Sequence, residues 1–170
     1  MKTMKIKDLM MMMVAAVTLT FGVCACSSDD DDDTKPAAVA VADQVAGTYT
    51  GKQVLTVMGE PDEGTVTFVF TKSSDNAVDM TIPAYGEGMM TIPEMLVKGI
   101  ALTKSESQIY TGSLASYAGV VKNNDGTEKA YTVSDVSVIF TDNDAVVAYS
   151  LQYGNMPFKF VGQFTGKKQN

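Results

Sequence analysis

From position 65 to 71 the chain reads Thr-Val-Thr-Phe-Val-Phe-Thr. Val66, Phe68 and Phe70 occupy one phase of a period-two pattern, and threonine occupies most of the other. Successive side chains of a β-strand point to opposite faces of its sheet, so this pattern predicts a strand with one buried face. The same alternation recurs at residues 78–82 and 158–164.

Short stretches rich in Gly, Asn, Asp, Ser and Pro divide the region after position 45 into eight such segments. All connections between them have hairpin length, so each strand should pair with its sequence neighbour. A sandwich would need a long crossing connection, whereas closing a meander removes both exposed edges. The prediction is an all-β domain, an eight-stranded antiparallel up-and-down barrel. The expected strands are 46–58, 64–72, 76–83, 89–103, 108–122, 127–140, 145–153 and 157–166.

Two irregularities predict local bends. Pro93 would lie inside the fourth strand, where it cannot donate to the ladder, so we expect a bulge or bend there. In the sixth strand, Tyr131 and Val133 follow one phase, whereas Val136 and Val138 follow the other. A bulge near Ser134 and Asp135 would reconcile the two phases.

The composition excludes several kinds of chemistry. Among 170 residues with a net charge of −7, there is no Arg and no His. A histidine base, a Ser-His-Asp triad and a His-ligated metal are therefore ruled out. We expect no catalytic residues, no metal site and no cofactor, and hence a protein that is not an enzyme. An acidic chain without Arg is also a poor candidate for binding nucleic acid.

The N-terminus has the pattern of an export signal. Lys2, Lys5 and Lys7 precede an apolar run from Leu9 to Val23. This run is shorter than the roughly 20 apolar residues of a spanning helix, so we expect a cleaved signal peptide over residues 1–25. The alternative is an uncleaved anchor.

The two cysteines of the chain, Cys24 and Cys26, directly follow this run. Val23-Cys24-Ala25-Cys26 resembles the lipobox of bacterial lipoproteins, in which a small residue precedes the acylated cysteine. Because Ala25 is smaller than Val23, the resemblance implies lipidation at Cys26 rather than at Cys24. More than one acyl chain would then anchor the protein stably to a membrane.

Five consecutive aspartates, Asp29 to Asp33, follow the cysteines. Such a block repels itself and cannot bury surface, so residues 26–45 should form a lipidated, acidic and flexible tether. The block also resembles the acidic export signal of surface lipoproteins in Bacteroidales-type bacteria. This implies the cell surface of the outer membrane as the location, with a plain spacer at its periplasmic face as the alternative.

Residues 46–170 resemble the calycin-like β-barrel domain of Bacteroides-type lipoproteins, which is related in architecture to lipocalins. The resemblance rests on the leader, on the opening Gly47-Thr48-Tyr49 and on the closing segment 158–166. The opening is similar to the Gly-x-Trp start of lipocalins, with Tyr in place of Trp. The family implies a barrel fold and no particular activity.

A barrel of eight strands can be filled by side chains or can hold one small ligand. The first hypothesis is therefore a non-catalytic module that binds a small apolar or amphipathic ligand. Tyrosine hydroxyls would orient it and a Met-rich segment would form a portal, or else a plug. The candidate ligand-binding residues are Tyr49, Phe68, Phe70, Met89, Met90, Tyr149, Tyr153 and Phe160. The alternative is a filled barrel that serves as a structural or protein-interaction lipoprotein, with a surface protein as its partner.

Lys98 interrupts an apolar phase in the fourth strand. It would either point inward, paired with a carboxylate such as Asp135, or turn to solvent after a register shift. The turns at 124–128 and 142–144 offer oxygen ligands but lack the spacing of a calcium loop, so we interpret them as ordinary turns.

Overall fold

The computed structural model describes residues 39–87 and 91–170. The expected signal peptide, Cys24, Cys26, the aspartate block, Met89 and Met90 lie outside the described residues.

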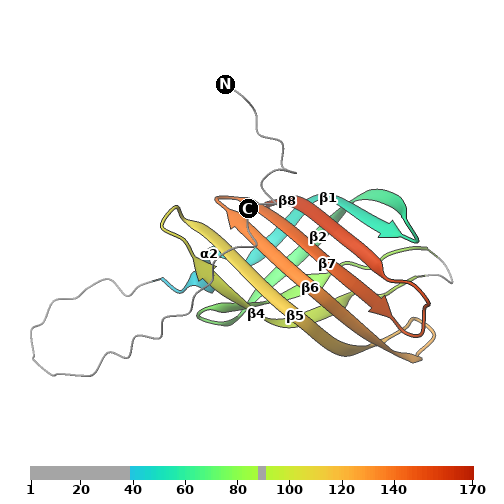
Figure 1. Cartoon of the computed structure of the whole chain (residues 1–170). Coiled ribbons are helices and arrows are strands. Elements are labelled where there is room, and N and C mark those ends of the chain that lie inside the picture. Colours follow the sequence, from blue (N-terminus) through green and yellow to red (C-terminus); the bar gives the residue numbers. More distant parts are fainter. Residues whose placement is uncertain (1–38, 88–90) are drawn as a thin grey trace, which may run out of the picture. The chain divides into compact units, whose positions relative to one another are not determined.

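Eight antiparallel strands form a closed barrel in which each strand pairs with the next and β8 pairs with β1 (Figure 1). The predicted up-and-down barrel is confirmed. β7 and β8 bury alternate residues along their length, as a strand with one face toward the core does. The strands are β1 (Gly47–Val57), β2 (Glu60–Ser74), β3 (Ala77–Ile82), β4 (Met95–Lys104), β5 (Ile109–Lys122), β6 (Glu128–Thr141), β7 (Asp144–Tyr153) and β8 (Phe160–Lys168).

The β1–β2 connection is shorter than expected. We expected a loop over residues 59–63, but Val57 pairs with Glu60 and leaves a turn of Met58 and Gly59. Both turn residues have positive φ, 52° and 90°, as a two-residue hairpin with primed-turn geometry requires. β2 therefore begins at Glu60 and passes through Pro61.

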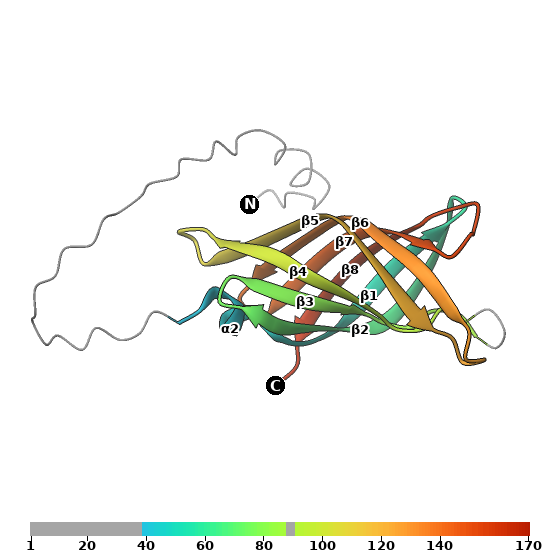
Figure 2. The same cartoon turned by 90° about the horizontal axis from the view of Figure 1, so that it is seen from below.

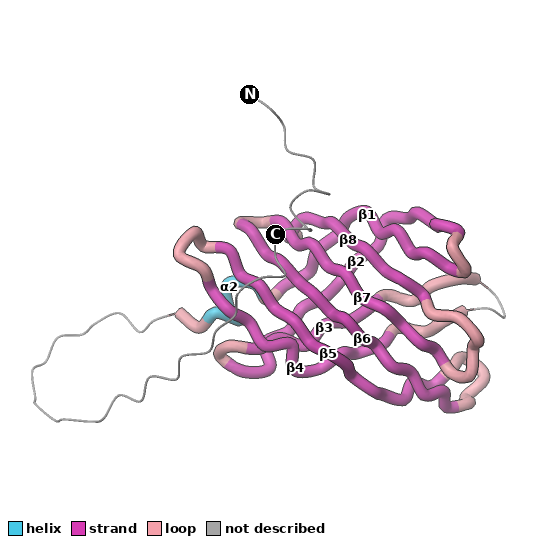
Figure 3. The backbone as a smooth tube through the Cα atoms, in the orientation of Figure 1, coloured by secondary structure: helices cyan, strands magenta, loops and turns pink. Residues whose placement is uncertain are grey.

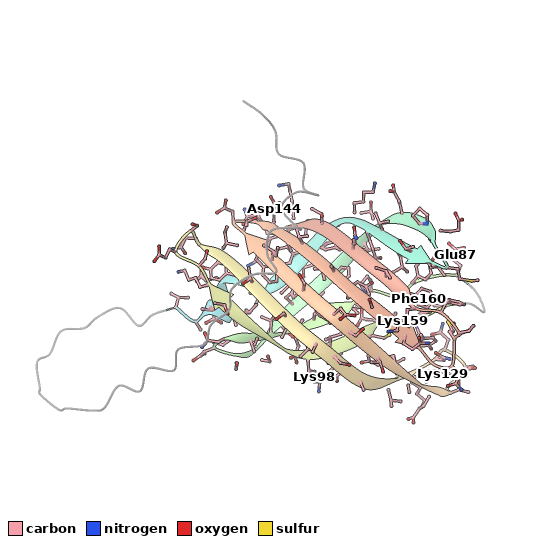
Figure 4. All side chains as sticks on the ribbon, in the orientation of Figure 1. Glu87, Lys98, Lys129, Asp144, Lys159 and Phe160 are labelled. Atoms are coloured by element: carbon pink, nitrogen blue, oxygen red, sulfur yellow. The ribbon has the colours of Figure 1, made fainter. Side chains whose placement is uncertain are left out.

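The fourth strand starts later than predicted, because Pro93 precedes β4 rather than bending it. Tyr85 and Ile92 form an isolated antiparallel bridge ahead of the strand. The register shift lies opposite Gly99, whose φ is +75° and whose amide donates to Asp79 Oδ1 at 2.9 Å. Lys98 is consequently exposed and points away from the barrel (Figure 4), so its inward alternative is wrong.

The predicted bulge in the sixth strand is confirmed. The register between β6 and β7 shifts between Ser134 and Ser137, and Asp135 has a positive φ of 55°. The extra residue lets Tyr131 and Val133 on one side of the bulge face the same core as Val136 on the other.

One end of the barrel is covered by a short helix, α2 (Val41–Val45), in a stretch that we expected to be tether. Ala42 and Val45 are buried, and the Ala42 amide donates to the Asp75 carbonyl at 3.0 Å. The Tyr49 hydroxyl donates to the Val45 carbonyl at 2.9 Å. Figure 3 shows α2 at the end opposite the β1–β2 turn. Over residues 39–87 and 91–170, no helix has the length and apolarity needed to cross a membrane.

Aromatic rings fill the middle of the barrel. The Phe70 ring packs edge-on against the rings of Tyr49 and Phe140, with centroids 5.6 and 4.8 Å away. Phe68 lies 4.5 Å from Phe164 and 6.2 Å from Tyr149 between ring centroids. This core lies within one compact unit, Ala37–Asn170. A unit with its own hydrophobic core can in principle fold alone.

Candidate ligand-binding site

A hollow opens at the end of the barrel away from α2, where β2 runs on beyond its pairing with β3. β3 pairs with β2 only from Val69 to Ser74, so in the described part of the chain residues 60–68 have a strand partner on the β1 side alone. Residues 83–87, here called the strap, run past that open edge. The hollow between them has a volume of about 500 Å³, within the range of small-molecule sites. Its lining is Gln53, Leu55, Asp62, Glu63, Gly64, Thr65, Val66, Tyr85, Gly86 and Glu87.

Two buried residues of β1, polar Gln53 and apolar Leu55, line the hollow. Gln53 is 5% exposed, and its Nε2 donates to the Tyr149 hydroxyl at 2.7 Å. Burial raises the pKa of Tyr149 far above its ordinary value, and the hydrogen bond from Gln53 opposes that rise only in part. Tyr149 thus stays a neutral phenol that holds Gln53 in place, with Leu55 buried nearby on the same strand.

Gly64 leaves open space in the lining of the hollow, where another residue would place a side chain. It follows the inward phase of Val66, Phe68 and Phe70 on β2. A Cβ placed on Gly64 would meet no atom within 4 Å. The hollow therefore exists partly because this inward position carries no side chain.

Tyr85 fixes the strap to the barrel. Its hydroxyl donates to Asp62 Oδ2 at 2.9 Å, and its backbone exchanges two hydrogen bonds with Ile92, 2.9 and 2.7 Å long. Its ring packs edge-on against Phe160, with centroids 6.2 Å apart. Burial raises the pKa of Tyr85, as do the hydrogen bond and the charge of Asp62. The phenol therefore remains a donor across the neutral range.

Carboxylates dominate the charge around the hollow. Asp62, Glu63 and Glu87 line it, and no lysine does. Glu63 is already paired with Lys52, 2.6 Å away. Figure 4 shows Lys129 and Lys159 at the same end of the barrel as Glu87, but neither belongs to the lining. The hollow thus offers acceptor oxygens together with a small apolar floor, which Leu55 and Val66 form.

None of the described candidate residues from the sequence belongs to the lining of this hollow. Tyr49, Phe68 and Phe70 belong to the aromatic core, and burial raises the pKa of Tyr49 to about 12. Tyr149 supports Gln53, and Phe160 supports Tyr85. The Tyr153 hydroxyl donates to the Asn123 side chain.

The sequence reasoning missed Gln53, Asp62, Gly64 and Tyr85. On β1 the sequence did contain a usable indication, because polar Gln53 occupies the same inward phase as Tyr49 and Leu55. On β2 no such indication was visible, because residues 59–63 were interpreted as a loop and were not assigned to either face of a strand. Once β2 is extended to Glu60, Asp62 and Gly64 continue its inward phase.

A second hollow of about 370 Å³ lies at the α2 end. Its one charged lining residue is Lys104, which sits 5.7 Å from the centroid of the Tyr110 ring. The two ends of the barrel therefore differ in the sign of their lining charge. Nowhere in the described parts of the chain do three His, Cys, Asp or Glu side chains gather closely enough to hold a metal ion.

Comparison with known proteins bears on the fold. No family model matches the chain, and no curated protein matches it. Its structure is similar to the crystal structure of a putative outer membrane protein from Bacteroides fragilis, with a TM-score of 0.57 and 18% sequence identity. The match covers 76% of this chain and 53% of the other, so this chain spans about half the length of that protein. At this identity the similarity concerns the fold alone.

Proposed function

We propose that this chain is an outer-membrane lipoprotein, anchored through Cys26 and displayed at the cell surface. Its calycin-like barrel acts as a non-catalytic binding module for a small amphipathic ligand. The location is supported by the leader, by the aspartate block and by the similarity in fold to a putative outer membrane protein of Bacteroides fragilis. The binding role is carried by one observation, the hollow of about 500 Å³ at the open edge of β2.

The shape of the hollow favours a ligand with a short apolar part and a polar end. Leu55 and Val66 provide the apolar contact, and Gln53 together with Tyr85 provides polar groups of fixed orientation. The lining thus combines a small apolar area with a few polar groups of fixed orientation, and such polar groups orient the ligand in small-molecule sites. The aromatic core beneath is the rigid mount.

Gly64→Phe should abolish binding without unfolding the barrel, because the new side chain enters open space. We expect residues 37–170, purified from their own host, to carry a discrete mass that is lost on organic extraction. The same domain with Gly64→Phe should carry none. Native mass spectrometry measures both.

Thr71→Phe provides the control, since it adds the same ring to an exposed position of the same strand. This variant should keep the bound mass. A mass retained by Gly64→Phe would place the ligand elsewhere and contradict the proposed site.

Cys26→Ala should abolish labelling of the protein by a fatty-acid analogue in cells, because the acylated thiol is lost. Cys24→Ala should leave most labelling in place. Gel fluorescence of the purified chain distinguishes the two. Labelling lost in Cys24→Ala and kept in Cys26→Ala would move the anchor to Cys24.

A further inference from the structure

We infer that the hollow selects a cationic amphiphile, a primary ammonium group on a short alkyl chain. This inference rests on the proposed function and specifies its ligand class. It follows from three features of the described residues: the carboxylates at the rim, the apolar floor, and the absence of a lysine from the lining.

The carboxylates that line the hollow, here called the rim, are Asp62, Glu63 and Glu87. The protein does not neutralise their negative charge in full. Glu63 has a partner in Lys52, whose amine lies on the outward side of β1 and β2. Asp62 receives a hydrogen bond from Tyr85, a neutral donor that leaves the charge in place. A carboxylate has about four acceptor sites, so Asp62 can accept a further donor from a ligand.

An ammonium group matches this rim better than an alcohol or a carboxylate does. It has three donors and no acceptor, so it can bond to carboxylate oxygens without an unpaired lone pair. Charge-assisted hydrogen bonds are also stronger than neutral ones. An anionic head would instead face Asp62 and Glu87 with repulsion. The alkyl chain would then lie on Leu55 and Val66, over the space that Gly64 leaves open.

The α2 end provides an internal contrast. Its hollow is lined by Lys104 and by no carboxylate. An anion attracted by the protein at all would therefore be expected at that end. The end of the barrel at which a charged probe binds therefore tests whether the lining charge selects the ligand.

The test compares three probes with the same alkyl chain, n-octylammonium, n-octanol and n-octanoate, below their micellar concentrations. Titration of the ¹⁵N-labelled domain, residues 37–170, followed by NMR gives affinity and location together. We expect changes in the amide chemical shifts of Gln53 and Gly64. Octylammonium should bind roughly tenfold more tightly than octanol, and octanoate should bind most weakly. Raising the salt concentration should weaken octylammonium binding and leave octanol binding unchanged.

The double variant Asp62→Asn/Glu87→Gln should reduce the preference for octylammonium over octanol to near one, with octanol binding retained. The control is Glu106→Gln/Asp142→Asn, which removes the same charge from exposed turns at the other end of the barrel. This control should keep the full preference.

The outcomes separate the inference from the proposed function. Equal binding of the three probes, or a preference for octanoate, would overturn the cationic class and leave the hollow as a ligand site. A preference that survives in Asp62→Asn/Glu87→Gln, or disappears in the control, would also overturn it, since net charge would then be the cause. Failure of all three probes to shift Gln53 or Gly64 would overturn both.

Discussion

Phe70→Ala is expected to lower the free energy of unfolding by about 3–5 kcal/mol, the range for removing a buried aromatic ring. Phe70 is 1% exposed, and its ring packs against both Tyr49 and Phe140. At this level β2 pairs with both neighbouring strands, because Phe70 lies opposite Gly47 of β1 and Met80 of β3, so the wall cannot collapse easily into the space left behind. Urea unfolding of the domain, followed by circular dichroism, measures the loss.

Thr71→Ala is the matched control, because residue 71 is the next position on β2 and is exposed. This substitution should change the free energy of unfolding by no more than roughly 0.5 kcal/mol. A Phe70→Ala variant that loses less than about 1 kcal/mol would contradict a tightly packed aromatic core.

Gly51→Ala should destabilise the domain by about 3 kcal/mol or more, through forced separation of β1 and β8. Gly51 pairs with Gly166, and a Cβ at position 51 would lie 2.2 Å from the Thr165 carbonyl oxygen and 2.3 Å from the Gly166 Cα. Both atoms belong to backbone, so no side chain can swing away. Thermal unfolding measures the loss, and amide exchange should be fastest along the β1–β8 pair.

Gly64→Ala is the control for this prediction, because the strand type and the chemical change are the same. Its new methyl group meets no atom within 4 Å. We expect stability to be unchanged or to rise by up to about 1 kcal/mol, since Ala restricts the unfolded chain more than Gly does. Similar losses in both variants would mean that strand propensity, and not the close approach of β8, explains the need for glycine at position 51.

The fold was predictable because its signals are local. Alternation such as Val66-Thr67-Phe68 reports which face of a strand is buried, and the short turns leave each strand only its neighbour as a partner. The phase change in the sixth strand likewise predicted the bulge beside Asp135. The start of β4 was wrong because Pro93 is compatible both with a bulge and with the residue ahead of a strand.

The candidate site was not predictable in the same way. The aromatic residues chosen from the sequence face inward, but inward residues can line a cavity or fill it, and the periodicity is the same for both. Tyr49, Phe68 and Phe70 lie in the packed core. The hollow is instead lined by Gln53, Asp62 and other residues of β1, β2 and the strap, whose proximity depends on how far β3 extends along β2.

The sequence alone establishes that this is an acidic chain without Arg or His, and its pattern predicts eight strands in a meander. These properties follow from composition and from periodicity within single segments, which need no knowledge of distant contacts. Tertiary structure alone decided which inward positions are empty. Gly51 and Gly64 are both inward glycines, yet the first meets the backbone of β8 and the second opens onto the hollow (Figure 2 shows β1 between β8 and β2). The difference arises from the separation of neighbouring elements around the barrel, which no pattern along one strand encodes.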